Sequence, residues 1–239
     1  MRGVDISHYQ KGLTIKQIKE AGCEFAIIKL TEGNFLIDSA AFGFYHEAFT
    51  LGFPVGCYCY SYAATPEQAR REAEFLLKTI NGFPMPCGIF LDVEEPKQLT
   101  LAYPALMSVL TAWCDTIRAA GYVPGVYGSE YNLWAKISPE DMPADALVWV
   151  AHYGKEPDVA CDLWQSNDSG NIDGVTVDTD ETRSAWFEGL VLKGYKEPDK
   201  PPDACPIDGP CESPLELIAE FLRTDACREL FKAFIAGKE

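Results

Sequence analysis

The strongest constraint on the fold is a repeated alternation of short apolar segments with longer helical patterns. Continuous apolar runs such as FAIIKLT (25–31) and GIFLDVE (88–94) are typical of strands buried on both faces. Segment 65–82, which lies between them, opens with Thr-Pro and closes with Asn-Gly, as helices commonly do. Strand–helix repeats with right-handed crossovers build a parallel sheet, and enough repeats close that sheet into a barrel.

The pattern changes in the second half of the chain. Strands are predicted at 146–153, 161–167 and 175–178, but the stretches between them hold no good helix, and Asp-Gly at 173–174 indicates a turn. We therefore predict an α/β fold, an irregular TIM-like (β/α) barrel with five βα units followed by three strands with few helices. The expected strands of the five units are 3–7, 25–31, 54–63, 88–94 and 122–128, and the expected helices are 14–22, 38–51, 65–82 and 99–121.

Three regions follow from composition. Residues 1–192 are the predicted catalytic barrel, 193–214 a Pro- and Asp-rich linker, and 215–239 a short helical tail. Helices this short hold no core of their own, so we expect the tail to dock on the barrel or on a second chain.

The nine cysteines divide along the same boundary. We expect the six in the barrel to be free thiols that pack as small apolar side chains. The sequence alone does not decide whether Cys205 and Cys211 form a disulfide bond, which would leave Cys227 without a partner in the tail. The six are Cys23, Cys57, Cys59, Cys87, Cys114 and Cys161.

Charge and composition exclude several classes of function. The net charge of −16 argues against nucleic acid and against a basic helix on a membrane surface. No apolar run reaches the roughly 18 residues of a membrane span. With three histidines and no C-x-x-C pair, neither a metal site nor a cofactor is predicted. The first residues lack the pattern of a signal peptide.

Acidic side chains follow three of the predicted strands. Asp92 and Glu94 end the apolar run GIFL, and as residues i and i+2 they point to one face. Asp5 and Asp178 stand at the ends of strands 3–7 and 175–178. The carboxyl ends of barrel strands meet at one mouth, where crowded carboxyls have separated pKa values, as glycoside hydrolysis requires. D-x-E alone also fits solvated loop acids or helix caps, and Asp180 is expected to be a cap.

Aromatic residues on or just after the strands supply a second ingredient, because sugar rings stack on aromatic faces. Core packing accounts for about half of such residues, and Tyr58, Tyr60 and Tyr62 alternate with Cys57 and Cys59 across one strand. Lys29 in a buried strand requires a carboxylate partner at the barrel centre, as a structural ion pair or as part of the catalytic surroundings. The aromatic candidates are Tyr9, Tyr58, Tyr60, Tyr62, Tyr127, Trp149, Tyr153 and Trp164.

Taken together and in order, these motifs resemble glycoside hydrolase family 25, the lysozymes of the fungal and bacteriophage muramidase type. The resemblance covers about residues 1–192. It rests on GVDISHYQ (3–10), FAIIKLTEG (25–33), PVGCY (54–58), FLDVE (90–94), GVYGS (125–129), VWVAHY (148–153), LWQ (163–165) and GVTVD (174–178).

The resemblance implies hydrolysis of the β-1,4 bond between N-acetylmuramic acid and N-acetylglucosamine in bacterial peptidoglycan. Since the first residues lack a signal-peptide pattern, we expect either an endolysin made in a phage's host cytoplasm or a trimmed secreted protein. It implies Glu94 as general acid, Asp92 as its partner, and Asp5 and Asp178 as the other acids of the site. The substrate's acetamido group or an enzyme carboxylate then acts as nucleophile; we favour the former, with net retention. Substrate-binding positions are expected at Tyr58, Lys29, Tyr127, Trp149, Trp164 and Gln165. Cys59, Tyr60 and Ser166 depart from residues common in the family.

Two other functions fit parts of the pattern. One is a barrel that binds peptidoglycan or another glycan without cutting it. The other is a chitinase-like hydrolase, although Gly88 and Ile89 stand where its strand would carry earlier acids. Cell-wall hydrolysis is favoured because all four candidate acids are present.

Overall fold

The computed structural model describes residues 1–194 of the chain. Its strands are β1 (Arg2–Ile6), β2 (Phe25–Glu32), β3 (Leu36–Ile37), β4 (Val55–Tyr60), β5 (Ile89–Asp92), β6 (Pro124–Ser129), β7 (Leu147–Ala151), β8 (Leu163–Ile172) and β9 (Val175–Thr182). Its α-helices are α1 (Ile15–Glu20), α2 (Ala41–Thr50), α3 (Pro66–Ile80), α4 (Pro96–Leu99), α5 (Tyr103–Ala119) and α6 (Ala185–Lys193).

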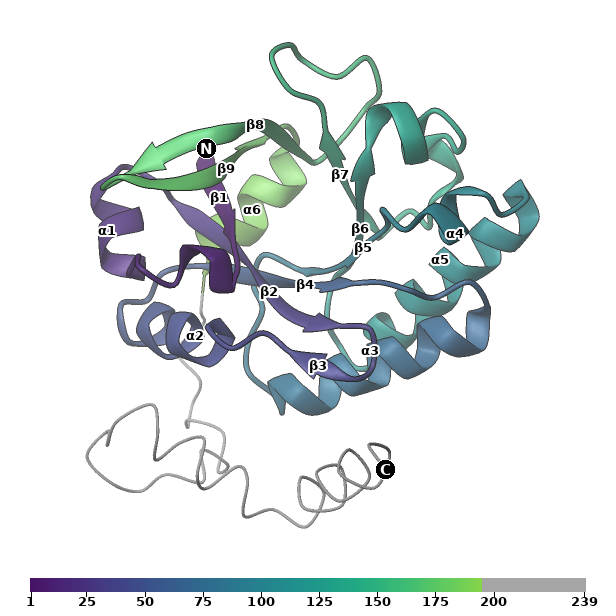
Figure 1. Ribbon diagram of the computed structural model, residues 1–239, viewed down its shortest axis with the longest axis horizontal. Helices are drawn as coiled ribbons and strands as arrows, with labels where there is room; N and C mark the ends of the chain where they lie inside the picture. Colours follow the sequence, from purple (N-terminus) through teal and green to yellow (C-terminus); the bar gives the residue numbers. More distant parts are fainter. Residues whose placement is uncertain (195–239) are drawn as a thin grey trace, which may run out of the picture. The chain divides into compact units, whose positions relative to one another are not determined.

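The strands form one sheet that closes on itself, as Figure 1 shows. The order is β1-β9-β8-β7-β6-β5-β4-β2-β3, and the parallel pairing of β1 with β2 completes the ring, with β3 as an added edge strand. The predicted α/β barrel is confirmed. β9 runs antiparallel to both β8 and β1, so the last strand closes the ring in the reverse direction.

The helices of the first half follow the sequence signals closely. Thr65 caps α3 by accepting a hydrogen bond from the Gln68 amide, and Pro66 occupies the first turn. The predicted helix 99–121 corresponds to α5, which begins at Tyr103 with Pro104 in its first turn; a separate one-turn helix, α4, precedes it. Figure 1 shows α3 and α5 on the outside of the sheet.

The second half has fewer helices, as predicted. β6 is followed only by the short π-helix η2 (Glu130–Trp134) and the 3₁₀ turn η3 (Pro139–Asp141). β8 and β9 form a hairpin at Asp173-Gly174, where both residues have positive φ, 50° and 85°. Such a pair is typical of a tight hairpin turn. The prediction that the last strand ends at Asp178 is wrong, because ladder pairing with β8 and β1 continues to Thr182.

Two apolar cores flank the barrel wall. The larger lies between the strands and the outer helices, and the smaller fills the barrel interior. α6 contributes Phe187 and Val191 to the interior core, where Phe187 meets Phe25 edge to face with ring centroids 5.3 Å apart. We call this end of the interior the floor; the opposite end, the mouth, is where the parallel strands finish.

Other sequence predictions concern side chains and the tail. Five of the six barrel cysteines are buried free thiols, as expected, whereas Cys161 is half-buried. The predicted linker 193–214 from residue 195 onward, with the bridge considered between Cys205 and Cys211, and the tail 215–239 lie outside the described residues. None of the described helices is long and apolar enough to cross a membrane.

Candidate active site

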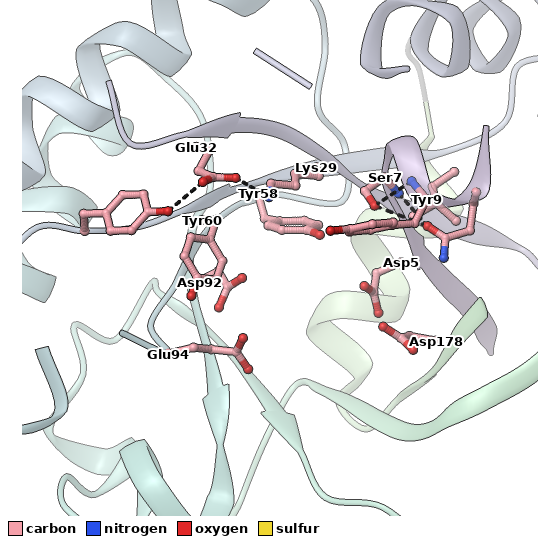
Figure 2. Close-up of a pocket in the computed structure, with 13 residues that line it drawn as sticks. Asp5, Ser7, Tyr9, Lys29, Glu32, Tyr58, Tyr60, Asp92, Glu94 and Asp178 are labelled. Atoms are coloured by element: carbon pink, nitrogen blue, oxygen red, sulfur yellow. Dashed lines mark hydrogen bonds and ion pairs between the residues drawn. The ribbon is translucent and has the colours of Figure 1, made fainter. Parts of the chain in front are cut away.

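A pocket opens at the mouth of the barrel, where β1, β2, β4 and β5 end, as expected of this architecture. Its volume is about 440 Å³. Figure 2 shows the four predicted acids pointing into the same opening. The pocket is lined by Asp5, Ile6, Ser7, Tyr9, Gln10, Lys29, Glu32, Tyr58, Tyr60, Tyr62, Asp92, Glu94 and Asp178.

β5 delivers the first pair of acids. Asp92 is the last residue of the strand and is buried, whereas Glu94 lies two residues farther on and is exposed. Burial and the charge of Glu94 raise the pKa of Asp92 well above its ordinary value. Partial burial raises the pKa of Glu94, a hydrogen bond with Tyr127 opposes the rise, and the charge of Asp178 adds to it.

β1 and β9 deliver the second pair. Asp5 and Asp178 are direct partners in the antiparallel register, and their carboxyl groups face each other in Figure 2. Burial, followed by the charge of Asp178, raises the pKa of Asp5 to about 8. Burial and the charge of Asp168 raise the pKa of Asp178. Because β9 runs backwards, its early residues rather than its last ones reach the mouth.

Asp180 is a fifth acid, and the expectation that it caps a helix is wrong. It lies two residues beyond Asp178 in β9 and is 0% exposed. One of its carboxyl oxygens accepts a hydrogen bond from the indole N–H of Trp149 at 2.9 Å. Burial, and then the charge of Asp5, raise the pKa of Asp180 well above its ordinary value.

A hydrogen-bond network beneath the pocket connects the two pairs. The Gln165 amide donates to Asp5 at 2.7 Å, and its carbonyl oxygen accepts from the hydroxyls of Tyr127 and Tyr153, both at 2.9 Å. Tyr127 also forms a hydrogen bond with Glu94. Gln165 therefore has one fixed orientation, which holds Asp5 and, through Tyr127, Glu94.

Lys29 has the carboxylate partner that its sequence context requires. Its ammonium group donates to Glu32 at 2.9 Å and lies 5.1 Å from the centre of the Tyr60 ring. The hydroxyl of Tyr62 donates to the other oxygen of Glu32 at 2.6 Å, so Glu32 is held from two sides. The Lys29 and Tyr62 hydrogen bonds together lower the pKa of Glu32.

The predicted alternation along β4 is confirmed. Cys57 and Cys59 are fully buried behind the strand, whereas Tyr58 and Tyr60 line the pocket. The Tyr60 hydroxyl donates to Glu95 at 2.9 Å, which fixes its ring at the pocket edge.

The predicted binding residues on β6, β7 and β8 do not line the pocket. Trp149 is buried in the interior core against Tyr127, with ring centroids 4.5 Å apart. Neighbours in a strand point to opposite faces, so Trp164 and Gln165 do not both point inward. The Trp164 indole donates to the His152 carbonyl at 2.7 Å, and Arg183 lies over its ring. Direct contact of these residues with substrate stays a prediction; their positions suit support of the acids.

Four pocket residues were not among the predicted site residues: Ile6, Ser7, Gln10 and Glu32. Ser7 follows β1 and forms a capping box with Gln10 that starts the 3₁₀ turn η1 (His8–Gln10) and carries Tyr9, 79% exposed, over the pocket edge. The S-x-x-Q spacing could have signalled that turn. Glu32 is the last residue of β2, the strand that bears Lys29, and it is the acid nearest to that lysine in the sequence.

Comparisons with known proteins agree with this geometry. The model of the family described as glycosyl hydrolases family 25 matches residues 4–175. The chain is 30% identical over 199 residues to the autolytic lysozyme of Clostridium acetobutylicum, covering 81% of this chain and 58% of that protein. It is 25% identical over 211 residues to lysozyme M1 of Streptomyces globisporus, covering 81% and 69%.

Solved structures show the same fold. The bacterial lysozyme from Streptomyces coelicolor superposes with a TM-score of 0.70 at 24% identity, covering 80% of this chain and 96% of that one. The muramidase from Trichobolus zukalii gives a TM-score of 0.66 at 22% identity, covering 80% and 98%.

Proposed function

Because the chain belongs to the glycosyl hydrolases of family 25, we propose that it hydrolyses bacterial peptidoglycan at the β-1,4 bond between N-acetylmuramic acid and N-acetylglucosamine. One observation carries the proposal: Asp5, Asp92, Glu94 and Asp178 all line one pocket at the barrel mouth, beside aromatic rings that suit a sugar. The place of action is the bacterial cell wall, in keeping with relatives named as an autolytic lysozyme and as endolysins.

Glu94 is the proposed general acid. Its raised pKa, caused by partial burial and opposed by the Tyr127 hydrogen bond, favours a protonated carboxyl that can give its proton to the glycosidic oxygen. The sugar hydroxyl then leaves as a neutral alcohol, while positive charge develops on the ring that loses it. Glu94 becomes a carboxylate and is ready to accept a proton from water in the second step.

Asp92 assists from the same side of the pocket. We favour the substrate's own 2-acetamido oxygen as the nucleophile, which forms a bond to the anomeric carbon as the glycosidic bond breaks. Because the charge of Glu94 is one cause of the raised pKa of Asp92, a proton on Glu94 favours Asp92 as the carboxylate of the pair. In this proposal the Asp92 carboxylate accepts a hydrogen bond from the acetamido N–H and stabilises the positive charge that the group acquires. Water then attacks the anomeric carbon, Glu94 takes its proton, and the two displacements give net retention.

The test is mass spectrometry of the soluble fragments from purified peptidoglycan, with the parent enzyme, Glu94→Gln and the control Glu74→Gln, which changes an exposed side chain on α3. We expect fragments ending in reducing N-acetylmuramic acid from the parent and the control. Removal of a general acid should lower the rate about 10²–10⁴-fold in Glu94→Gln. Full activity of Glu94→Gln would remove Glu94 from this role. If the parent protein binds peptidoglycan without producing new reducing ends, it is a glycan-binding barrel. If it cleaves chitin oligomers but not peptidoglycan, it is a chitinase-like enzyme.

A further inference from the structure

An aromatic platform stands beside the pocket, formed by Phe35 on the connection between β2 and β3 and by Tyr62 just after β4. Phe35 is 66% exposed and stacks on Tyr62, with ring centroids 5.7 Å apart and an angle of 30° between the planes. Tyr62 is itself 37% exposed and lines the pocket. The Phe35–Tyr62 platform is therefore continuous with the candidate active site and extends away from it.

The platform is held in place by the backbone on one side. Gly33 adopts φ of +53°, and a Cβ atom there would lie 2.5 Å from the Phe35 ring and 3.3 Å from the Tyr62 ring. Only glycine allows both rings to approach the backbone this closely.

Polar and aromatic contacts hold it on the other side. The Tyr62 hydroxyl is bound to Glu32, which is in turn bound to Lys29. Tyr60 packs edge-on against Tyr62 with centroids 5.4 Å apart. The rings are thus fixed before any ligand arrives, so binding costs little side-chain entropy.

The chemistry of the platform matches a sugar ring. A flat apolar face packs against the C–H face of a pyranose, while Glu32 at its edge can accept hydrogen bonds from hydroxyl or amide groups. The exposed apolar surface that Phe35 and Tyr62 form together suggests a ligand that covers it. The proposed substrate is a polymer, and its strand must leave the pocket beyond the sugars at the cleaved bond.

We propose that the Phe35–Tyr62 platform binds a further sugar of the same glycan strand, beyond the pair of sugars joined by the cleaved bond. This inference rests on the proposed function and specifies its substrate, since the enzyme would favour long strands over short fragments. A second copy of the chain or a protein partner is the competing occupant, because Leu36 beside Phe35 is also exposed.

The test compares steady-state kinetics on defined peptidoglycan glycans of four and eight sugars, for the parent enzyme and Phe35→Ala. We expect KM for the eight-sugar glycan to rise about fivefold with kcat unchanged, and little change for the four-sugar glycan. Phe42→Ala is the matched control, because Phe42 is an exposed phenylalanine on α2 outside the pocket lining. Phe35→Trp should restore the parent KM if stacking is the cause, and thermal unfolding verifies that each variant is folded.

Three results would overturn the inference. Unchanged KM for both glycans would mean that Phe35 contacts no sugar. Equal losses on both glycans would mean that Phe35 shapes the pocket itself. Conversion of a dimer into a monomer by Phe35→Ala, seen by sedimentation, would assign the platform to a second copy. If the parent enzyme cleaves neither glycan, the result contradicts the proposed function and not the role of Phe35.

Discussion

The two ends of the barrel interior are made by the same strands and have opposite chemistry. At the floor the inward residues are apolar, such as Phe25, Phe90 and Leu147, and α6 covers them with Phe187. Two residues farther along, Phe90 of β5 gives way to Asp92, a buried acid of the mouth. Because side chains of a strand alternate with a period of two, one strand supplies both a core residue and a site residue.

The difference separates stability from function. Apolar burial at the floor favours folding, at about 25 cal/mol per Å² of apolar surface. At the mouth, burial raises the pKa values of acids that would be charged in the unfolded chain, which costs stability at neutral pH. Changes at the mouth should therefore reduce activity and spare stability, while changes at the floor should do the reverse.

The largest effect is expected from a change at the mouth. Asp92→Asn keeps the size of the side chain but removes the carboxylate that stabilises developing charge, so kcat should fall about 10²–10³-fold. The melting temperature should stay the same or rise, because Asp92 is a buried acid with one oxygen that lacks a hydrogen-bond partner. Release of reducing sugar and thermal unfolding measure both quantities; a marked loss of stability would contradict the separation.

The next effect belongs to the floor. Phe187→Ala removes a fully buried ring and should lower the free energy of unfolding by about 3–5 kcal/mol. At 25 °C, kcat should be unchanged. Leu192→Ala on the same helix is the control, since Leu192 is exposed and should have little effect. Urea unfolding measures the loss of stability. A lower kcat in the folded Phe187→Ala variant would show that the floor also affects activity and would contradict the separation of stability from function.

A smaller effect is expected from the dependence of stability on pH. Asp5 titrates near 3.8 in the unfolded chain and at about 8 in the folded protein, so between these pH values the folded protein binds more protons. Stability should therefore fall as pH rises through this window. Asp180→Asn keeps an acceptor for Trp149 and a donor toward Asp5 while removing one buried acid, so it should weaken this fall.

Urea unfolding at pH 4 and pH 7 measures the dependence. Asp180→Asn should gain stability over the parent at pH 7 and little at pH 4, whereas Glu74→Gln should match the parent at both. Equal pH dependence in the parent and Asp180→Asn would show that Asp180 holds no proton in the folded protein.

Local patterns predicted the parts of the molecule that local forces determine. The run GIFL followed by Asp92 and Glu94 correctly predicted where β5 ends and that its acids lie at the mouth. Thr65 and Pro66 correctly predicted the start of α3. Asp173-Gly174 placed the hairpin.

Long-range pairing determined what the patterns missed. The reversal of β9 depends on closure against β1, whose residues are more than 170 positions away in the sequence. The extent of β9 and the burial of Asp180 therefore could not be predicted from the neighbouring residues. The LWQ motif led us to predict both Trp164 and Gln165 as substrate-binding residues. Adjacent side chains of a strand point to opposite faces, so only one of the two can face the barrel interior.

The proposed chemistry requires that the crowded, partly dry mouth lets Glu94 keep its proton, so the pKa of Glu94 is the decisive quantity. Carboxyl carbons of ¹³C-labelled protein can be titrated by NMR, with Glu94→Gln assigning the signal. We predict a pKa above the ordinary 4.5 that shifts back toward it in Asp178→Asn, because Asp178 contributes to the rise. If Glu94 titrates at or below 4.5 and its pKa does not respond to Asp178→Asn, the mouth does not favour a protonated Glu94 and the proposed general acid is wrong.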